Sequence, residues 1–180
     1  RELEILRVAV DKAESRVNRK LAQSDLIREV NAIVEQFIRD KKLICYGGTA
    51  INNILPSEDQ FYDKNVDIPD YDFFSVNAVN DAKELADIYL RQGYSDVEAK
   101  SGVHKGTYKV FVNFIPVADV TYIIPDIYKS LKKGIIKVNG LSYAPPDFLR
   151  MGMYLELSRP DGDVSRWEKV LKRLVLLNKH

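Results

Sequence analysis

A stripe of apolar residues at helical spacing follows Ser24, a residue type that often caps the start of a helix. Apolar side chains that recur every three or four positions indicate one buried helix face. The stripe consists of Leu26, Ile27, Val30, Ile33, Val34, Phe37 and Ile38. The charged segment before it, residues 2–21, is also compatible with a helix. The pattern therefore predicts a helical N-terminal segment over residues 1–43.

Beyond this segment the apolar runs become short. Residues 41–48, KKLICYGG, are typical of a buried strand that stops at Gly47 and Gly48. Residues 49–55 predict a short helix that leaves this glycine turn. Residues 57–69 have turn-forming chemistry and no period, which predicts a loop.

The remaining elements alternate without a regular strand–helix–strand order. Strands are predicted at residues 70–76, 95–100, 107–124 and, as a strand or hairpin, 135–144. Helices are predicted at residues 80–93, 125–134 and 146–158 and from Asp163 onward. The last helix is expected to bury one face formed by Val164, Trp167, Val170, Leu171 and Leu174. We therefore predict the α+β (mixed α/β) class: a mixed sheet flanked by helices, with a core over residues 44–144 and C-terminal helices over residues 145–180.

The composition narrows the class of protein. Of the 180 residues, 46% are hydrophobic and 29% are charged, as in ordinary globular proteins. The net charge of +1 argues against an obligate nucleic-acid coat, which carries a strongly basic field. The single cysteine, Cys45, excludes an intrachain disulfide, and no apolar run approaches the roughly 18–20 residues that span a bilayer. Because the chain begins with Arg1 and ends in an open helical pattern, we expect a fragment whose C-terminal helices lead into a further domain.

The glycine turn has the chemistry of an anion site. A strand that runs into Gly47 and Gly48 and then into a helix presents backbone N–H groups at a positively polarised helix end. Glycine lets a ligand approach the backbone closely, and Thr49 adds a hydroxyl donor. We therefore interpret these three residues as candidate phosphate ligands. A tight turn that binds nothing would explain the glycines equally well.

Two aspartates occupy the aromatic strand DYDFF. Residues two apart in a strand point to the same face, so the carboxylates of Asp70 and Asp72 should converge and repel each other unless a cation compensates them. Mg²⁺ typically binds one or two carboxylates together with substrate phosphates. The alternative is a solvated polar strand face, although the neighbours Tyr71, Phe73 and Phe74 argue against a simple surface strand.

A third carboxylate extends this pattern. Asp119 is the only charge between Lys109 and Asp126, and it lies among apolar and β-branched residues. An acid in a buried strand needs a partner, and we take a metal site shared with the aspartate pair as the simplest one. Two ions held by three acids can stabilise both the attacking and the leaving oxygen of an in-line displacement. The alternative is an edge-strand aspartate that faces water.

The glycine turn, the Asp-x-Asp pair and the distant third aspartate together resemble the motif of the nucleotidyltransferase superfamily that includes DNA polymerase β and poly(A) polymerases. The gap between Gly48 and Asp70 is longer than is usual in that superfamily, which implies an insertion in the loop before the pair. The resemblance implies a palm-type catalytic domain.

Three stretches, YGGTAINNILP, IPDYDFFS and MYLELSRPDGDVSRWEKVLKRL, are similar to the poly(A) polymerase catalytic subunits of nucleocytoplasmic large DNA viruses. The similarity implies template-independent transfer of AMP from ATP to an RNA 3′ end, with Mg²⁺ or Mn²⁺ as cofactor, in the host cytoplasm or the virion. It implies that Asp70 and Asp72 bind both metal ions and that Asp119 binds the ion which activates the primer 3′-OH. It also implies that Gly47, Gly48 and Thr49 hold the triphosphate.

Two basic clusters are candidate contacts for an RNA backbone, although a solvated surface is the simpler explanation of each. One cluster comprises Lys129, Lys132, Lys133 and Lys137, and the other comprises Arg166, Lys169, Lys172 and Arg173. Two other functions stay open: a nucleotidyltransferase with another acceptor (a tRNA end, a protein or a small molecule), and a non-catalytic nucleotide- or RNA-binding scaffold. The presence of all three aspartates counts against the scaffold. The sequence does not decide whether a second copy or a processivity subunit is a partner.

Overall fold

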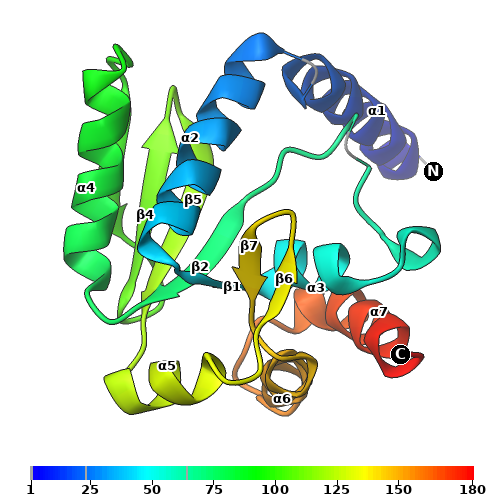
Figure 1. The fold of residues 1–180 in the computed structure, drawn as a ribbon. Helices are drawn as coiled ribbons and strands as arrows, with labels where there is room; N and C mark the ends of the chain where they lie inside the picture. Colours follow the sequence, from blue (N-terminus) through cyan, green and yellow to red (C-terminus); the bar gives the residue numbers. More distant parts are fainter. Residues whose placement is uncertain (1, 23, 64) are drawn as a thin grey trace.

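A seven-stranded mixed sheet forms the centre of the protein (Figure 1). The structure is a computed structural model that describes residues 2–22, 24–63 and 65–180. The strands lie in the order β3-β4-β5-β2-β1-β7-β6. Their bounds are Ile44–Tyr46 for β1, Tyr71–Ser75 for β2, Val97–Ser101 for β3, Thr107–Val112 for β4, Ile115–Tyr122 for β5, Ile136–Val138 for β6 and Leu141–Tyr143 for β7. The β2–β5 and β1–β7 pairs are parallel and the other pairs are antiparallel, which confirms the predicted mixed sheet.

Helices pack on both faces of this sheet. The α-helices are α1 Glu2–Ala22, α2 Asp25–Lys41, α3 Gly47–Ile54, α4 Ala78–Arg91, α5 Pro125–Leu131, α6 Pro146–Leu157 and α7 Trp167–Asn178, and two short 3-10 helices are η1 Ser57–Asp59 and η2 Val164–Arg166. Neighbouring residues of β2 contact different layers: the ring of Phe73 lies 6.3 Å from that of Phe37 on α2, whereas the ring of Phe74 lies 5.8 Å from that of Phe148 on α6. The face that carries Phe74 is therefore opposite to the face that α2 covers.

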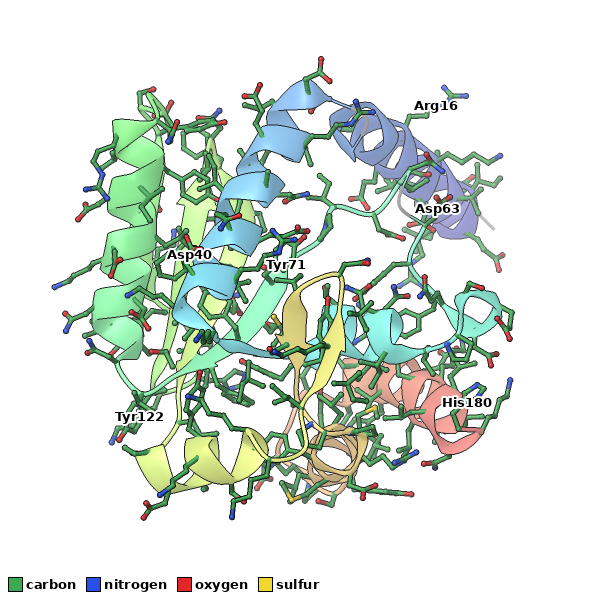
Figure 2. The ribbon with its side chains drawn as sticks, in the orientation of Figure 1. Arg16, Asp40, Asp63, Tyr71, Tyr122 and His180 are labelled. Carbon is green, nitrogen blue, oxygen red and sulfur yellow. The ribbon has the colours of Figure 1, made fainter. Side chains whose placement is uncertain are left out.

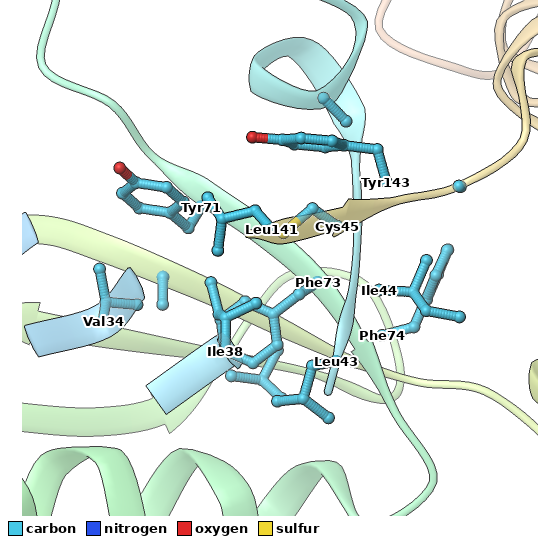
Figure 3. Packing of buried hydrophobic residues seen from close by; sticks show 14 of the residues in the cluster. Val34, Ile38, Leu43, Ile44, Cys45, Tyr71, Phe73, Phe74, Leu141 and Tyr143 are labelled. Atoms are coloured by element: carbon cyan, nitrogen blue, oxygen red, sulfur yellow. The ribbon is translucent and has the colours of Figure 1, made fainter. Parts of the chain in front are cut away.

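The apolar stripe after Ser24 forms the predicted helix and faces the core. The Ser24 side chain accepts a hydrogen bond from the N–H group of Ile27, as an N-cap does. Val34 and Ile38 are buried, and Ile38 lies beside Phe73 of β2 (Figure 3). The core also takes in residues of the C-terminal helices: Leu149, Met153, Val170, Leu174 and Leu177.

The strand predicted over residues 107–124 is wrong in one respect: it is a hairpin of two strands, β4 and β5. The chain reverses at Asn113 and Phe114, which have φ values of 50° and 66°. Two residues with positive φ form the turn that matches the twist of a hairpin. The apolar pattern continues through this turn because Phe114 is itself an exposed aromatic residue, so periodicity alone did not mark it.

The last helix is also shorter than predicted, since it begins at Trp167 after the 3-10 helix η2. Val170 and Leu174 are buried as expected, but Val164 and Leu171 are 56% and 52% exposed, so they do not belong to the buried face. No helix in the described part of the chain is both long and apolar enough to cross a membrane.

Candidate active site

A polar row crosses the middle of the sheet. Asp72 in β2 lies opposite Tyr46 in β1 and opposite Asp119 in β5, and Asp119 in turn lies opposite Lys109 in β4. Residues in register on neighbouring strands project from the same face. The sheet therefore brings Asp72 and Asp119 together from separate parts of the sequence, on the face opposite α2.

Asp70 lies one residue before β2, and the glycine turn helps to fix it. The Thr49 hydroxyl donates a hydrogen bond to the backbone carbonyl of Asp70 at 2.9 Å. Oδ1 of Asp70 is buried and has no hydrogen-bond partner within the described residues. Burial, followed by the charge of Asp119, raises the pKa of Asp70 to about 6, and Lys109 opposes this shift. Thr49, predicted as a phosphate ligand, thus uses its hydroxyl to hold the acid in place.

Asp72 lies in the middle of the row, between Tyr46 and Asp119. Burial raises its pKa to about 7, the charges of Asp70 and Asp119 raise it further, and the charges of Lys109 and Arg166 oppose this shift. The structure thus brings the three predicted acids into one neighbourhood. A buried carboxylate with raised pKa next to a second acid is typical of a functional site, because such an arrangement is unfavourable without a cation.

Asp119 has a partner that the sequence reading overlooked. Its two carboxylate oxygens accept hydrogen bonds from Nζ of Lys109 at 2.8 Å and 2.6 Å. The Asp119 side chain is 15% exposed and that of Lys109 is 33% exposed. Lys109, from the adjacent strand, therefore compensates the charge of Asp119 in this structure, and a metal ion as a further partner of Asp119 stays a prediction. The hairpin determines this partner, because a turn at residues 113 and 114 places residue 109 opposite residue 119.

Each glycine of the turn makes room for a specific side chain. Gly47 has φ of 76°, and a Cβ there would lie 2.3 Å from Oδ2 of Asp72. A Cβ at Gly48 would lie 2.6 Å from the hydroxyl of Tyr62 and 2.9 Å from Nη1 of Arg173. The positive φ and the contact with Asp72 therefore require a glycine at position 47, whereas a side chain at Gly48 would have to displace the ends of Tyr62 and Arg173. The turn opens α3, whose start is not capped by a hydrogen bond from its N-cap side chain.

The donor set of Asp70 and Asp72 fits a divalent cation, because it offers a buried oxygen without a partner and two carboxylates with raised pKa values. Among the described residues, however, no three acidic, histidine or cysteine side chains are arranged to hold one ion.

The lysines predicted to contact RNA lie away from this row. Lys132 and Lys133 follow α5, which begins after the C-terminal end of β5, and Lys137 lies on the edge strand β6. All three are exposed. Tyr71 and Tyr122 mark the two ends of the β2–β5 pair (Figure 2), and Asp72 lies near the Tyr71 end. Lys132 and Lys133 therefore lie beyond the end of the β2–β5 pair that is opposite to Asp72, and Lys137 lies three strands away from β2.

The fold and the three acids Asp70, Asp72 and Asp119 define a class of protein. It is a mixed-sheet domain of the nucleotidyltransferase type, in which a glycine turn lies beside an Asp-x-Asp pair and a third aspartate. Within that class the chain belongs to the family described as "Poly(A) polymerase catalytic subunit", whose model matches residues 32–163. This confirms the family that the motifs resemble.

Individual relatives agree with this assignment. A protein named as a poly(A) polymerase catalytic subunit from Acanthamoeba polyphaga mimivirus is 33% identical over 84% of this chain and 26% of its own length. The corresponding protein of African swine fever virus, strain Badajoz 1971 Vero-adapted, is 35% identical over 85% of this chain and 35% of its own length. The crystal structure of the Megavirus polyadenylate synthase superposes with a TM-score of 0.84 and 32% identity, over 99% of this chain and 37% of that one. The chain thus spans between a quarter and two fifths of these relatives.

JHP933 from Helicobacter pylori shares the fold alone, with a TM-score of 0.56 and 13% identity over 87% of this chain and 68% of that one.

Proposed function

We propose that this chain forms the catalytic portion of a template-independent RNA 3′-end adenylyltransferase. The observation that carries the proposal is the register of β2 and β5, which places Asp72 beside Asp119. The uncompensated charge of Asp70 and Asp72 adjoins the turn of Gly47. Family membership supports AMP transfer from ATP to an RNA 3′ end.

The proposed reaction forms a bond between the 3′ oxygen of the RNA and the α-phosphorus of ATP and breaks the bond to the β-phosphate, so that pyrophosphate leaves. Asp70 and Asp72 would hold both divalent ions, Mg²⁺ or Mn²⁺, and Asp119 would hold one of them. When bound, these ions supply positive charge to the attacking and the leaving oxygens. Phosphoryl transfer needs little beyond such positioning and charge neutralisation.

The chain's own residues would position these groups. Gly47 lets α3 begin directly against Asp72, because any side chain there would displace that carboxylate. Gly48 and the N–H groups at the start of α3 would contact phosphate oxygens. Thr49 would keep Asp70 at the edge of the row through its bond to the Asp70 carbonyl. Lys109 would hold the carboxylate of Asp119 in place beside Asp72.

The proposal is tested by incubating the full-length protein with an RNA primer, one nucleoside triphosphate at a time, and Mg²⁺ or Mn²⁺. We expect the RNA primer to become longer with ATP only when a metal ion is present. Asp72→Ala serves as the inactive control. Transfer to a tRNA end, a protein or a small molecule instead of the primer would identify another acceptor. No transfer to any acceptor would favour a binding scaffold, for which the Lys109–Asp119 ion pair is the supporting observation.

Further parts of the proposal concern partners and location. The RNA backbone would contact Lys132, Lys133 and Lys137, because all three side chains are exposed. This contact would lie away from the three acids. A second copy or a processivity subunit would extend the RNA path. The viral relatives favour the host cytoplasm or the virion as the place of action.

A further inference from the structure

Arg173 on α7 is a buried cation whose charge no carboxylate neutralises within residues 2–22, 24–63 and 65–180. Its exposed fraction is 8%. The rings of Phe61 and Tyr62 lie 5.0 Å and 5.6 Å from Cζ of its guanidinium, and Nη2 donates to the Tyr62 hydroxyl at 2.7 Å. A neutral hydroxyl orients the guanidinium without cancelling its charge. Because a buried charge without a counter-ion is unfavourable, this position favours an anionic ligand.

Arg173 lies against the glycine turn. Nη1 is only 2.9 Å from the point that a Cβ at Gly48 would occupy. Gly48 belongs to the first turn of α3, where backbone N–H groups have no partner within the helix and the helix dipole is positive. The guanidinium therefore lies beside the start of α3. The positive charge of Arg173 and the positive end of the helix dipole would both stabilise an anion placed next to them.

Two further cations lie along the same helical face. Arg166, Lys169 and Arg173 are spaced by three and four residues, which places them one above the other. Burial lowers the pKa of Lys169, the charges of Arg173 and Arg166 lower it further, and Asp67 opposes them. Like charges one turn apart destabilise a helix, so this basic row is more favourable with an anion bound.

Arg166 has a carboxylate partner of its own, since it forms an ion pair with Glu156 at 3.2 Å. Lys172 differs from Lys169 because it pairs with Glu168 at 2.6 Å. The four basic residues that the sequence grouped together thus have different surroundings: Arg173 is buried, Arg166 and Lys172 are exposed and paired with glutamates, and Lys169 is exposed without an ion pair to any described residue.

We propose that Arg173 and Lys169 bind the β- and γ-phosphates of the nucleoside triphosphate. This inference rests on the proposed adenylyl transfer, which requires the α-phosphate near the acids. A guanidinium presents a planar fork of donors to two phosphate oxygens, and lysine adds a point charge. Both would stabilise the negative charge that develops on the pyrophosphate as it leaves.

The burial of Arg173 favours a nucleotide over an RNA backbone as the ligand. A polynucleotide backbone is usually held by exposed lysine and arginine side chains that follow the strand. Arg173 is instead buried against two aromatic rings and the start of α3, which favours the terminal phosphates of a small ligand over a polynucleotide strand.

The test compares Lys169→Met with Lys172→Met in the full-length protein, because the two lysines lie on one helix and both are exposed. Equilibrium binding is measured with ATP, inorganic tripolyphosphate, AMP and an RNA oligonucleotide. We expect Lys169→Met to weaken ATP and tripolyphosphate by roughly tenfold or more, the value of one charge-assisted contact. AMP binding should not change, and Lys172→Met should resemble the wild type. Arg173→Lys keeps the charge but loses the fork, and it should also weaken tripolyphosphate while its melting temperature shows that it folds.

Unchanged tripolyphosphate affinity in both Lys169→Met and Arg173→Lys would overturn the inference, and Arg173 would then only fasten the loop of Phe61 and Tyr62 to α7. Weaker RNA binding with unchanged ATP binding would also overturn it, because the row would then belong to the RNA path. The two proposals fail in different ways. Tripolyphosphate binding that depends on Lys169, without any adenylyl transfer, would support the subsite and contradict the proposed function. Adenylyl transfer by Lys169→Met with an unaltered KM for ATP would support the proposed function and contradict the phosphate subsite.

Discussion

Asp72 and Asp119 are neighbours across two parallel strands, yet the structure treats their charges in opposite ways. Both oxygens of Asp119 are bound by Lys109. Asp72 has Tyr46 as its other neighbour in the row, which brings no positive charge, and its pKa rises to about 7. The charges of the two acids are treated differently because β1 places a tyrosine beside Asp72, whereas β4 places a lysine beside Asp119.

This difference divides the site into two halves. On the side of the glycine turn, Asp70 and Asp72 leave negative charge that an external cation can neutralise. On the side of the hairpin, Asp119 already has a cation from the chain, and a metal ion has to compete with it. We therefore expect the first half to dominate metal binding and the second half to respond mainly when the reaction occurs.

Asp72→Ala should have the largest effect of any single change. We expect adenylyl transfer to fall by roughly a thousandfold or more, the scale of losing a principal electrostatic contact in a transition state. The melting temperature in metal-free buffer should stay constant or rise, because the change removes a buried carboxylate that Asp70 and Asp119 repel. Primer extension and thermal melting on one sample measure both effects.

Asp126→Ala, an exposed acid on α5, is the control for this experiment. Near-normal transfer by Asp72→Ala would remove the metal-site interpretation of the glycine-turn half.

Asp119→Asn tests the other half and should separate binding from turnover. The amide keeps the shape of the side chain but loses the charge, so ATP should still bind through the glycine turn and the aspartate pair. We expect kcat to fall by roughly a hundredfold or more, because Asp119 would hold the divalent ion that activates the 3′-OH in the transition state. The loss of stability should be small, since Lys109 is one-third exposed.

Measurement of ATP affinity and primer extension on the same Asp119→Asn sample decides between these outcomes. Retained extension would place Asp119 outside the reacting centre and would leave a site of two acids.

Gly47→Ala should disturb the glycine-turn half through packing. A side chain at φ of 76° is strained, by roughly 1–2 kcal/mol for a left-handed residue. The new Cβ would also meet Asp72 at 2.3 Å. Gly93→Ala is a matched control, because Gly93 has φ of 97° but nothing within 4 Å of its Cβ position. We expect both variants to melt at lower temperature and only Gly47→Ala to lose transfer activity as well. Equal losses of activity would mean that the contact with Asp72 is irrelevant.

These residues also show how far the sequence predicts the site. The acids and glycines are visible because each violates a local rule: a charge inside an aromatic strand, and two glycines at the end of an apolar run. The helix after Ser24 is visible because its apolar period is regular. The partner of Asp119 is not visible, because the turn at Asn113 and Phe114 leaves the strand pattern unbroken, and the hairpin register alone determines which residue lies opposite.

Arg173 illustrates a second limit. Helical spacing predicts that it shares a face with Lys169, and the sequence groups both with Lys172 as surface charges. Its burial depends on Phe61 and Tyr62, which belong to a loop without any period. A contact between a helix and an irregular loop 111 positions earlier in the chain leaves no local pattern.

Lys109→Met should give the smallest effect and the sharpest test of the comparison between the two halves. Without Lys109, Asp119 becomes a third uncompensated acid, so the metal-free protein should melt at a slightly lower temperature. Mg²⁺ or Mn²⁺ should then raise the melting temperature more than in the wild type, because the ion no longer has to displace the lysine and linkage converts tighter binding into stability. The half-saturating metal concentration should fall accordingly. Lys100→Met is the control, because Lys100 lies opposite Lys109 in β3 and pairs with Glu98 at 2.8 Å away from the acids. If the metal response of Lys109→Met equals that of the wild type and of Lys100→Met, Asp119 is not a metal ligand, and Lys109 serves only to neutralise it within the sheet.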